Sequence, residues 1–385
     1  MLFQPDDELL MLRDTAARLA RERFAAKAAH WDRTLEAPLE NLKPMADAGL
    51  TGITIDEAYG GSGATILHAV VAMEQIARVC PVTSAFILAN CTAAELIGQF
   101  GTEEQKQRYL TPVAAGEQIG CWAMTEPSAG SAANDMTTKA IADGDHYYIT
   151  GTKCFITRAA IASFYVTFAR VGGEPGSKAI AAFIVEKDDP GVRIGHLDVH
   201  MGLRGGASAE VIYDRCKVHK SRMIVPPGSF GRIMKGLNQA RVLNPTMCLG
   251  IAAEALDLSI AYARERKAFG QEIGRFQGIQ WMLAEMATKV ETMRTSIDRA
   301  AALLAAGDPD GPHQAAIAKL YTGRAAFEVV NDAMQIHGGY GYSSEFPIER
   351  MLRDVRALQL GGGTNEILKN RIAGTLLKMP GAASG

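Results

Sequence analysis

The spacing of apolar residues in the first third of the chain predicts helices. Leu67, Val70 and Val71 would lie on one face of a helix, and the run Gly-Gly-Ser-Gly at 60–63 marks its start. Thr102 precedes two glutamates, an order typical of a helix N-terminus, because its hydroxyl accepts from backbone N–H groups and acids favour the positive end of the helix dipole. We therefore expect an N-terminal helical domain over residues 1–117.

A different pattern begins near residue 119, where short runs rich in aromatic and β-branched residues replace the helical spacing. These runs lie at 147–150, 164–168 and 182–185, and turn pairs such as Asp143-Gly144 and Pro190-Gly191 separate them. Short strands with such turns are typical of an antiparallel barrel or sandwich. We expect this β domain to cover residues 118–227.

The last part of the chain, residues 228–385, returns to helical spacing and predicts long helices. Apolar residues recur every three or four positions and form two continuous seams, which are Cys248, Ile251, Ala255, Leu258 and Tyr262, then Leu283, Met286, Val290, Met293, Ile297, Ala300 and Leu304. Two such seams are typical of a four-helix bundle that also makes subunit contacts. The expected fold class is therefore α+β: an N-terminal helical domain, a central antiparallel β domain and a C-terminal four-helix bundle.

Length and composition narrow the class of protein. A chain of 385 residues is too long for one ordinary core, so two or three packed units are expected. The 40 Lys and Arg residues nearly cancel the 42 Asp and Glu residues, so no overall field attracts nucleic acid or an anionic membrane. The N-terminus is acidic, unlike a secretory signal, and no apolar run is expected to reach transmembrane length. The expected location is the cytoplasm.

The cysteines do not predict a metal site. They are scattered, with no Cys-x-x-Cys pair and no Cys/His spacing that suits zinc: Cys80, Cys91, Cys121, Cys154, Cys216 and Cys248. We expect buried, reduced thiols and no bound metal.

Residues 361–363 form the most distinctive local feature, three glycines followed by Thr364 at the start of a helix. Glycines let a backbone approach a ligand, and a helix N-terminus offers N–H groups to an anion or a carbonyl oxygen. A glycine-rich link between helices is an equally good interpretation of these residues alone.

Two further segments have candidate chemistry. The run Arg-Glu-Arg-Lys-Ala-Phe-Gly at 264–270, with Gln277 beyond it, could hold a diphosphate and an adenine, although a charged helix end with a glycine C-cap is the simpler interpretation. The run from Trp122 to Ser131 leads into small polar residues suited to lining a flat ring. No Rossmann or Walker glycine pattern is present, which argues against NAD and ATP.

Taken together, these features resemble the acyl-CoA dehydrogenase family over essentially the whole chain. The matching motifs are Thr-Glu-Pro-x-Ala-Gly-Ser at 125–131, Phe-Ile-Thr at 155–157, Met-Gly-Leu-Arg at 201–204, Arg-Lys-Ala-Phe-Gly at 266–270, Gln-Ile-His-Gly-Gly at 335–339, the stretch 350–354 and Gly-Thr-Asn-Glu at 363–366. Each motif alone is weak, but seven in register make a specific signal.

The resemblance implies FAD between the β domain and the bundle, with the adenine half held by a neighbouring subunit. Residues implied to line the flavin are Trp122, Met124, Thr125, Ser131, Phe155 and Thr157. Residues implied to hold diphosphate and adenosine from the second subunit are Arg266, Phe269, Gln277, Gln335 and Gly339, with Thr364 and Glu366 completing the cofactor contacts. Residues implied to contact acyl-CoA are Ser131, Asn238, Arg241 and Gly362.

The activity that the resemblance implies is α,β-desaturation of an acyl-CoA thioester. In this family a glutamate takes the α-proton, the flavin accepts a hydride from the β-carbon, and a ribityl hydroxyl and a backbone N–H polarise the thioester oxygen. The implied electron acceptor is electron-transfer flavoprotein, and the implied assembly is a homotetramer, or at least a dimer.

Neither position at which the family carries its glutamate holds a carboxylate in this chain. One position, just before Gly-Thr, is Gly362, and the other, just before Arg241, is Ala240. Gly362 keeps its backbone N–H, so a thioester oxygen could still be held. A general base contributes roughly 10²- to 10⁴-fold, so its loss would cripple desaturation without abolishing substrate binding.

Several explanations of the missing base are open at this point. Alanine could replace a native glutamate at 240, since Leu237, Asn238 and Arg241 match the group that carries it there. A different base could be recruited from elsewhere in the pocket, for which the sequence identifies no candidate. A protein that binds acyl-CoA and FAD without turnover is the alternative from another functional class.

Desulfination of a 3-sulfinoacyl-CoA is a further alternative, because family members that release sulfite lack the glutamate. The run Ser131-Ala132-Ala133 resembles theirs. They read the sulfinate with an arginine in the region of residues 80–88, where this chain has none. Arg158 could substitute, but we interpret it as a surface or subunit contact.

Overall fold

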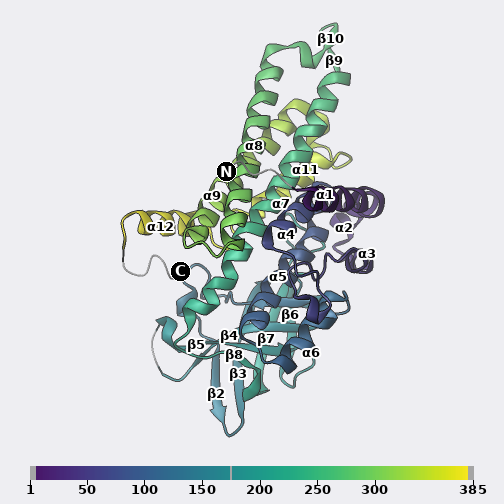
Figure 1. Ribbon diagram of the computed structural model, residues 1–385. Coiled ribbons are helices and arrows are strands. Elements are labelled where there is room, and N and C mark those ends of the chain that lie inside the picture. The colour runs from purple at the N-terminus through teal and green to yellow at the C-terminus, as the bar shows by residue number, and fades with distance from the viewer. Residues whose placement is uncertain (1–5, 174–175, 380–385) are drawn as a thin grey trace.

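The computed structural model describes residues 6–173 and 176–379. Figure 1 shows an N-terminal group of helices beside a twisted sheet, with long C-terminal helices projecting away from the sheet. The N-terminal helices are α1 (Asp7–Leu19), α2 (Ala28–Thr34), α3 (Leu42–Asp47), α4 (Ile66–Val79), α5 (Pro81–Phe100) and α6 (Glu103–Ala114). The predicted start at Thr102 is confirmed, because the Thr102 hydroxyl and the Gln105 side chain form a reciprocal capping box.

The middle of the chain forms an eight-stranded sheet in the order β6-β7-β3-β2-β4-β5-β8, with β1 beside β4. The strands are β1 (Gly120–Ala123), β2 (Lys139–Asp143), β3 (His146–Ile156), β4 (Phe164–Val171), β5 (Ile180–Glu186), β6 (Val192–Leu197), β7 (Ala209–His219) and β8 (Met223–Val225). Most neighbours are antiparallel, as predicted. The exception is β4, which pairs in parallel with β1 and β2.

The C-terminal part is built on three long helices, α7 (Phe230–Glu265), α8 (Gln277–Ala305) and α9 (Gly311–His337). The shorter helices α10 (Gly339–Tyr342), α11 (Pro347–Ala357) and α12 (Asn365–Leu376) complete this part of the chain, and a small hairpin, β9 (Lys267–Ala268) and β10 (Gln271–Glu272), links α7 to α8. The predicted seam of α8 is confirmed, since Met286, Val290, Met293, Ile297 and Ala300 are buried. The α+β fold class is therefore confirmed.

Two of these helices correct the expectation that no apolar run reaches transmembrane length. Both α5 and α7 have the length and mean hydropathy of a membrane span. Within the fold, 83% of the apolar stretch of α5 and 67% of that of α7 is buried, as in core helices of globular proteins. The six cysteines are buried and unpaired, as predicted.

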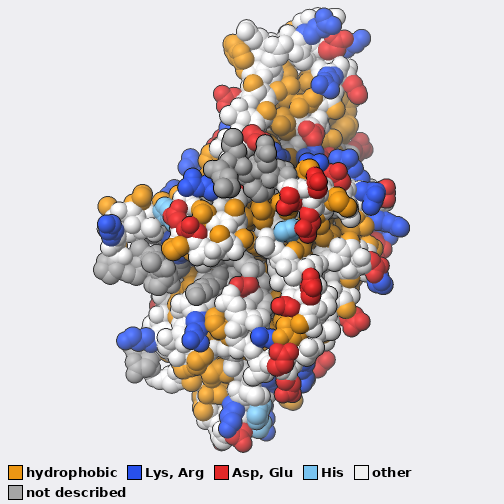
Figure 2. Space-filling view, in the orientation of Figure 1, with side chains coloured by type: hydrophobic (Ala, Val, Ile, Leu, Met, Phe, Trp, Pro, Cys, Tyr) orange, Lys and Arg blue, Asp and Glu red, His pale blue; other side chains and the backbone are white. Residues whose placement is uncertain are grey.

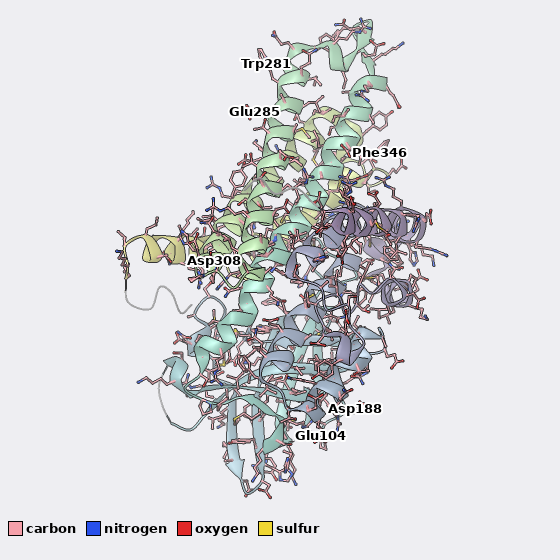
Figure 3. The ribbon with its side chains drawn as sticks, viewed as in Figure 1. Glu104, Asp188, Trp281, Glu285, Asp308 and Phe346 are labelled. Atoms are coloured by element: carbon pink, nitrogen blue, oxygen red, sulfur yellow. The ribbon has the colours of Figure 1, made fainter. Side chains whose placement is uncertain are left out.

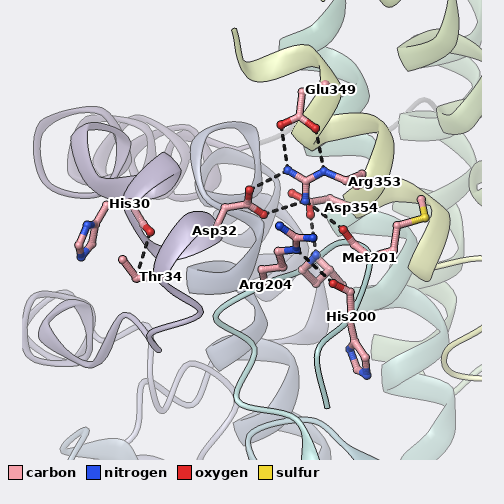
Figure 4. Close-up of polar contacts among 10 residues, drawn as sticks. His30, Asp32, Thr34, His200, Met201, Arg204, Glu349, Arg353 and Asp354 are labelled. Atoms are coloured by element: carbon pink, nitrogen blue, oxygen red, sulfur yellow. Dashed lines mark hydrogen bonds and ion pairs between the residues drawn. The ribbon is translucent and has the colours of Figure 1, made fainter. Parts of the chain in front are cut away.

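One arginine joins the N-terminal helices to the C-terminal part (Figure 4). The Arg353 guanidinium on α11 donates to both carboxylate oxygens of Asp32 on α2, at 2.9 and 2.7 Å. It also donates to Glu349 and to the carbonyl oxygen of Met201. A planar guanidinium that satisfies two carboxylates and a carbonyl fixes the relative positions of three segments far apart in sequence.

Candidate active site

One face of α7 brings together three segments to which the sequence assigned chemistry. Gly236, Ala240 and Asn244 are spaced four residues apart and so lie on the same face. A Cβ placed on Gly236 would lie 3.2 Å from Cζ3 of Trp122 on β1. A Cβ placed on Gly362 would lie 2.5 Å from Nδ2 of Asn244. Ala240, which is buried, therefore lies between the Trp122 strand and the glycine loop.

Residues 361–363 form a glycine loop that a buried lysine holds in place. Gly362 and Gly363 have φ of +67° and +99°, a backbone region that favours glycine. The buried Lys319 on α9 donates from Nζ to the carbonyl oxygen of Gly363 at 2.6 Å and to that of Leu358 at 3.4 Å. Burial, with Arg241 nearby, lowers the pKa of Lys319 to about 8. The lysine therefore fixes the shape of the loop through its carbonyl groups.

The amide of Gly362 is a free donor of this loop, as is that of Gly363. Gly362 is exposed, and among the described residues no acceptor takes up its N–H. Thr364 caps α12 as predicted, accepting from the Ile367 N–H at 3.3 Å. The arrangement leaves an N–H and a helix N-terminus facing outward beside α7, as a carbonyl oxygen or an anion requires.

A second part of the site lies at the ends of β1 and β3. Phe155 is 63% exposed and has φ of +55°, and Thr157, two residues on, is also exposed. Trp122 on β1 is half-buried, with its ring centroid 4.6 Å from that of Phe168. A large exposed aromatic face beside a hydroxyl and half-buried apolar side chains suits a flat ring with polar edges, and a flavin fits these residues.

The segment that follows β1 is held to β3 by a buried ion pair. Lys153 Nζ donates to Glu126 Oε1 at 2.8 Å and to the carbonyl oxygen of Met124 at 3.1 Å. Glu126 also accepts from the backbone N–H groups of Thr137 and Thr138. Burial alone would raise the pKa of Glu126, but Lys153 and these donors lower it to about 2. Burial lowers the pKa of Lys153 to about 8. The pair positions the segment that begins at Thr125.

The residues assigned to the diphosphate and adenosine lie elsewhere. Arg266, Phe269 and Gln277 surround the β9–β10 hairpin, at the end of the bundle farthest from the sheet (Figure 1). Gln335 and Gly339 are exposed close to this end, where the Arg266 guanidinium lies 5.8 Å from the Tyr340 ring centroid. The rise of an α-helix puts roughly 45 Å of α7 between Gly236 and Arg266, so one chain does not bring the two groups together.

Two expectations from the sequence are wrong. The first is a glycine C-cap at 270: α7 ends at Glu265, and Gly270, with φ of +82°, lies in the turn between β9 and β10. The second is that Arg158 is a surface or subunit contact. Its side chain is fully buried, donates to the carbonyl oxygens of Val82 and Gly205, and lies 3.8 Å from the Phe86 ring centroid. Since it is enclosed by these groups, it is not placed to bind a substrate anion.

Sequence reasoning missed Asn244, Lys319 and Glu95. Asn244 could have been found from its spacing of one turn from Ala240, and Lys319 as a cation in an otherwise apolar stretch. Glu95 is the only charged residue of α5. No cluster of three or more His, Cys, Asp or Glu among the described residues could hold a metal ion.

The fold and a site suited to a flat ring indicate a flavin-binding class of enzyme, and comparison with known proteins names the family. The chain matches family models for the N-terminal, middle and C-terminal domains of acyl-CoA dehydrogenases at residues 6–117, 121–216 and 230–377. The chain belongs to the acyl-CoA dehydrogenase family, whose members are FAD-dependent oxidoreductases, and FAD is its cofactor.

Individual relatives cover nearly the whole chain. It is 38% identical to the short-chain specific acyl-CoA dehydrogenase of Clostridium acetobutylicum, over 98% of this chain and 100% of that protein. It is 37% identical to the 3-sulfinopropanoyl-CoA desulfinase of Paraburkholderia xenovorans, over 98% of this chain and 97% of that protein.

Solved structures share the fold. Butyryl-CoA dehydrogenase from Megasphaera elsdenii has a TM-score of 0.95 at 32% identity, over 98% of this chain and 100% of that one. A chain in the structure of the electron transferring flavoprotein of Acidaminococcus fermentans has a TM-score of 0.96 at 37% identity, with the same coverage.

Proposed function

We propose that this protein introduces a double bond between the α and β carbons of an acyl-CoA thioester, with FAD as the hydride acceptor. The observation that supports this most is the single face of α7, which lines up Trp122, Ala240 and the Gly362 loop. A flavin packed against Trp122 and a thioester carbonyl bound at the Gly362 loop would place the α-carbon near residue 240.

In this proposal the Gly362 N–H donates to the thioester oxygen. That bond draws electron density from the carbonyl and makes the α-proton more acidic, an effect that is often worth several kcal/mol (~3) for one well-placed donor. Lys319 keeps the loop in the required shape. Arg241 Nη1 donates to Asn238 Oδ1 at 3.1 Å, which fixes the amide of Asn238, one of the residues proposed to contact acyl-CoA.

A second subunit is needed to complete the cofactor site, because the two groups of predicted FAD ligands lie at opposite ends of α7. The far end carries exposed aromatic side chains, Phe269, Trp281, Tyr340 and Tyr342, which is unusual for a surface that faces only water. Figure 2 shows hydrophobic side chains gathered on this upper part of the bundle, and Figure 3 places Trp281 there. We infer a homotetramer, or at least a dimer, that shares FAD between subunits.

The relatives and the balanced charge of the chain support two further parts of the proposal. Electron-transfer flavoprotein is the proposed electron acceptor, since a chain of very similar fold occurs in a structure of such a protein. The cytoplasm is the proposed location. We also propose that the chain divides into three domains, at residues 1–117, 118–227 and 228–385.

Anaerobic titration with butyryl-CoA tests the proposed function. The visible flavin absorption of the FAD-loaded protein is expected to bleach as the substrate is oxidised. Ala240→Glu is expected to bleach at least as fast, because residue 240 faces the site. Gly362→Glu is expected to lose bleaching, since its Cβ would meet Asn244 and its φ is +67°. Bleaching by Gly362→Glu but not by the unchanged chain would contradict the proposal.

Desulfination of a 3-sulfinoacyl-CoA is the second candidate, favoured by the desulfinase relative and by the lack of a carboxylate at 240 and 362. It predicts sulfite release from 3-sulfinopropanoyl-CoA without net bleaching of the flavin. The enclosed position of Arg158 speaks against it, because no anion can reach that guanidinium. Binding of acyl-CoA with neither sulfite release nor bleaching would instead indicate a non-catalytic binding protein.

A further inference from the structure

Helix α5 is buried along most of its length, with two half-buried positions. Every residue from Pro81 to Ile97 is buried except Leu88 and Glu95. These two are seven residues apart, which is close to two helical turns, so they lie on the same face. Glu95 is therefore a half-buried carboxylate on a core helix, and it is the only charge that this helix carries.

The Glu95 carboxylate reaches α7 beside position 240. Its Oε2 accepts from Nε2 of Gln239, the residue directly before Ala240, and its Oε1 accepts from Nε2 of Gln99. Leu96, the next residue of α5, lies 3.4 Å from a Cβ placed on Gly236, the same point that Trp122 approaches. The carboxylate therefore borders the face of α7 that carries the proposed active site.

The surroundings of Glu95 leave it available as a base. Both partners are neutral amides, and among the side chains that the structure describes, which do not include that of residue 235, no cation forms an ion pair with it. Each oxygen accepts one hydrogen bond and keeps capacity for a proton. Burial raises the pKa of Glu95 above its ordinary value, which brings a carboxylate closer to the pH at which general bases act most effectively.

We propose that Glu95 is the proton acceptor of this enzyme, in place of the glutamate that its relatives carry at the positions of Ala240 or Gly362. This inference rests on the proposed dehydrogenation. The α C–H bond breaks, its proton goes to the Glu95 carboxylate and its electron pair forms the Cα–Cβ double bond. The hydride from the β-carbon goes to FAD, so the acyl group is oxidised and the flavin is reduced by two electrons.

Exchange of the α-proton of butyryl-CoA with solvent deuterium, measured by mass spectrometry on the FAD-loaded protein, tests the inference. Glu95→Gln is expected to slow exchange by about 10²-fold or more, the usual contribution of a positioned base. Glu95→Asp should retain part of the rate. Ala240→Glu introduced into Glu95→Gln should restore exchange, because it returns a carboxylate to the same face of α7.

Two controls separate a base from a structural role. Gln239→Leu removes the hydrogen bond to Glu95 but keeps its carboxylate, so exchange should persist. Glu104→Gln neutralises an exposed carboxylate on α6, beside the sheet (Figure 3), and should leave exchange unchanged. If Gln239→Leu slowed exchange as much as Glu95→Gln, the role of Glu95 would be structural and the inference wrong.

The remaining outcomes distinguish this inference from the proposed function. If the unchanged chain exchanges the α-proton and Glu95→Gln does not slow that exchange, the inference is wrong and the proposed dehydrogenation stands. Exchange only after Ala240→Glu would overturn the inference and also the proposal that the unchanged chain is a dehydrogenase. No exchange by the unchanged chain or by Ala240→Glu, although both bind FAD and butyryl-CoA, would overturn the proposed function and the inference with it.

Discussion

Asn244 lies directly beneath Gly362, so that a Cβ on residue 362 would stand 2.5 Å from the Asn244 side-chain nitrogen. A side chain at position 362 would therefore displace the Asn244 amide, and it would also have to adopt a positive φ of +67°. Both features disfavour a carboxylate-bearing residue at 362 in this conformation, while the backbone amide stays open to a ligand. The chemistry of this site therefore has to use the backbone of residue 362.

Gly362→Ala should lower the free energy of unfolding by about 1–2 kcal/mol, the cost of a left-handed conformation for a residue with a Cβ, with a further loss from the collision with Asn244. Urea denaturation would measure the loss. Asn244→Ala in the same chain should relieve only the collision. If the variant with both Gly362→Ala and Asn244→Ala showed no loss in the free energy of unfolding, the positive φ would make no contribution.

Glu126→Gln should destabilise the protein strongly, because it leaves Lys153 as a buried charge without its carboxylate. Both side chains are almost fully enclosed, at 0% and 1% exposure. Breaking such a pair typically costs about 3–5 kcal/mol, and urea denaturation would measure it. Glu104→Gln on the surface of α6 is the matched control and should cost little. A loss below about 1 kcal/mol for Glu126→Gln would mean that the pair is not desolvated in solution.

Asp298 predicts a pH dependence of stability. Burial, and then the nearby Glu74, raise its pKa to about 7 in the folded chain. Because the folded pKa lies above the unfolded value, the group binds protons more tightly in the fold, and its contribution to stability is lost as pH rises from about 4 to about 7. Asp298→Asn should therefore be more stable than the unchanged chain at pH 8 by at least about 1.4 kcal/mol, the equivalent of one pKa unit.

The stabilities of Asp298→Asn and of the unchanged chain should be compared over a range of pH. The difference between Asp298→Asn and the unchanged chain should shrink toward zero below pH 4, where the carboxyl is protonated in both states. Equal midpoints of urea denaturation at pH 8 would show that Asp298 ionises normally in the fold.

A shared cofactor site predicts complementation between damaged chains. Arg266→Ala alters the far end of α7, and Thr157→Ala alters the exposed end of β3, so each variant alone should bind FAD weakly. Mixed oligomers, formed by refolding the two together, should contain some sites with both parts intact and should regain part of the FAD bound. Equal FAD binding by the mixture and by the separate variants would argue that one chain holds the whole cofactor.

The sequence predicted the elements better than it predicted their contacts. Thr102 and Thr364 mark helix starts through bonds to residues three positions away, and such local signals are readable from sequence. The glycine at 270 was misassigned because a C-cap and a hairpin turn both need positive φ, and only the course of the chain separates them.

The site was harder to predict, because its members meet through packing. Glu95 approaches Gln239 across 144 positions, and no local pattern reports that approach. Arg158 resembled a surface residue because arginine is rarely buried, yet carbonyl groups and the Phe86 ring enclose it. Family motifs located the ends of β1 and β3 and the glycine loop, but the side chain that serves as base has to be found from the structure.

The most direct test is the mass of the acyl-CoA after turnover by the unchanged, FAD-loaded protein with an electron-accepting dye and butyryl-CoA. We expect a product two hydrogens lighter than the substrate, formed while the dye is reduced. An unchanged substrate mass, from a protein shown to bind both FAD and butyryl-CoA, would contradict it.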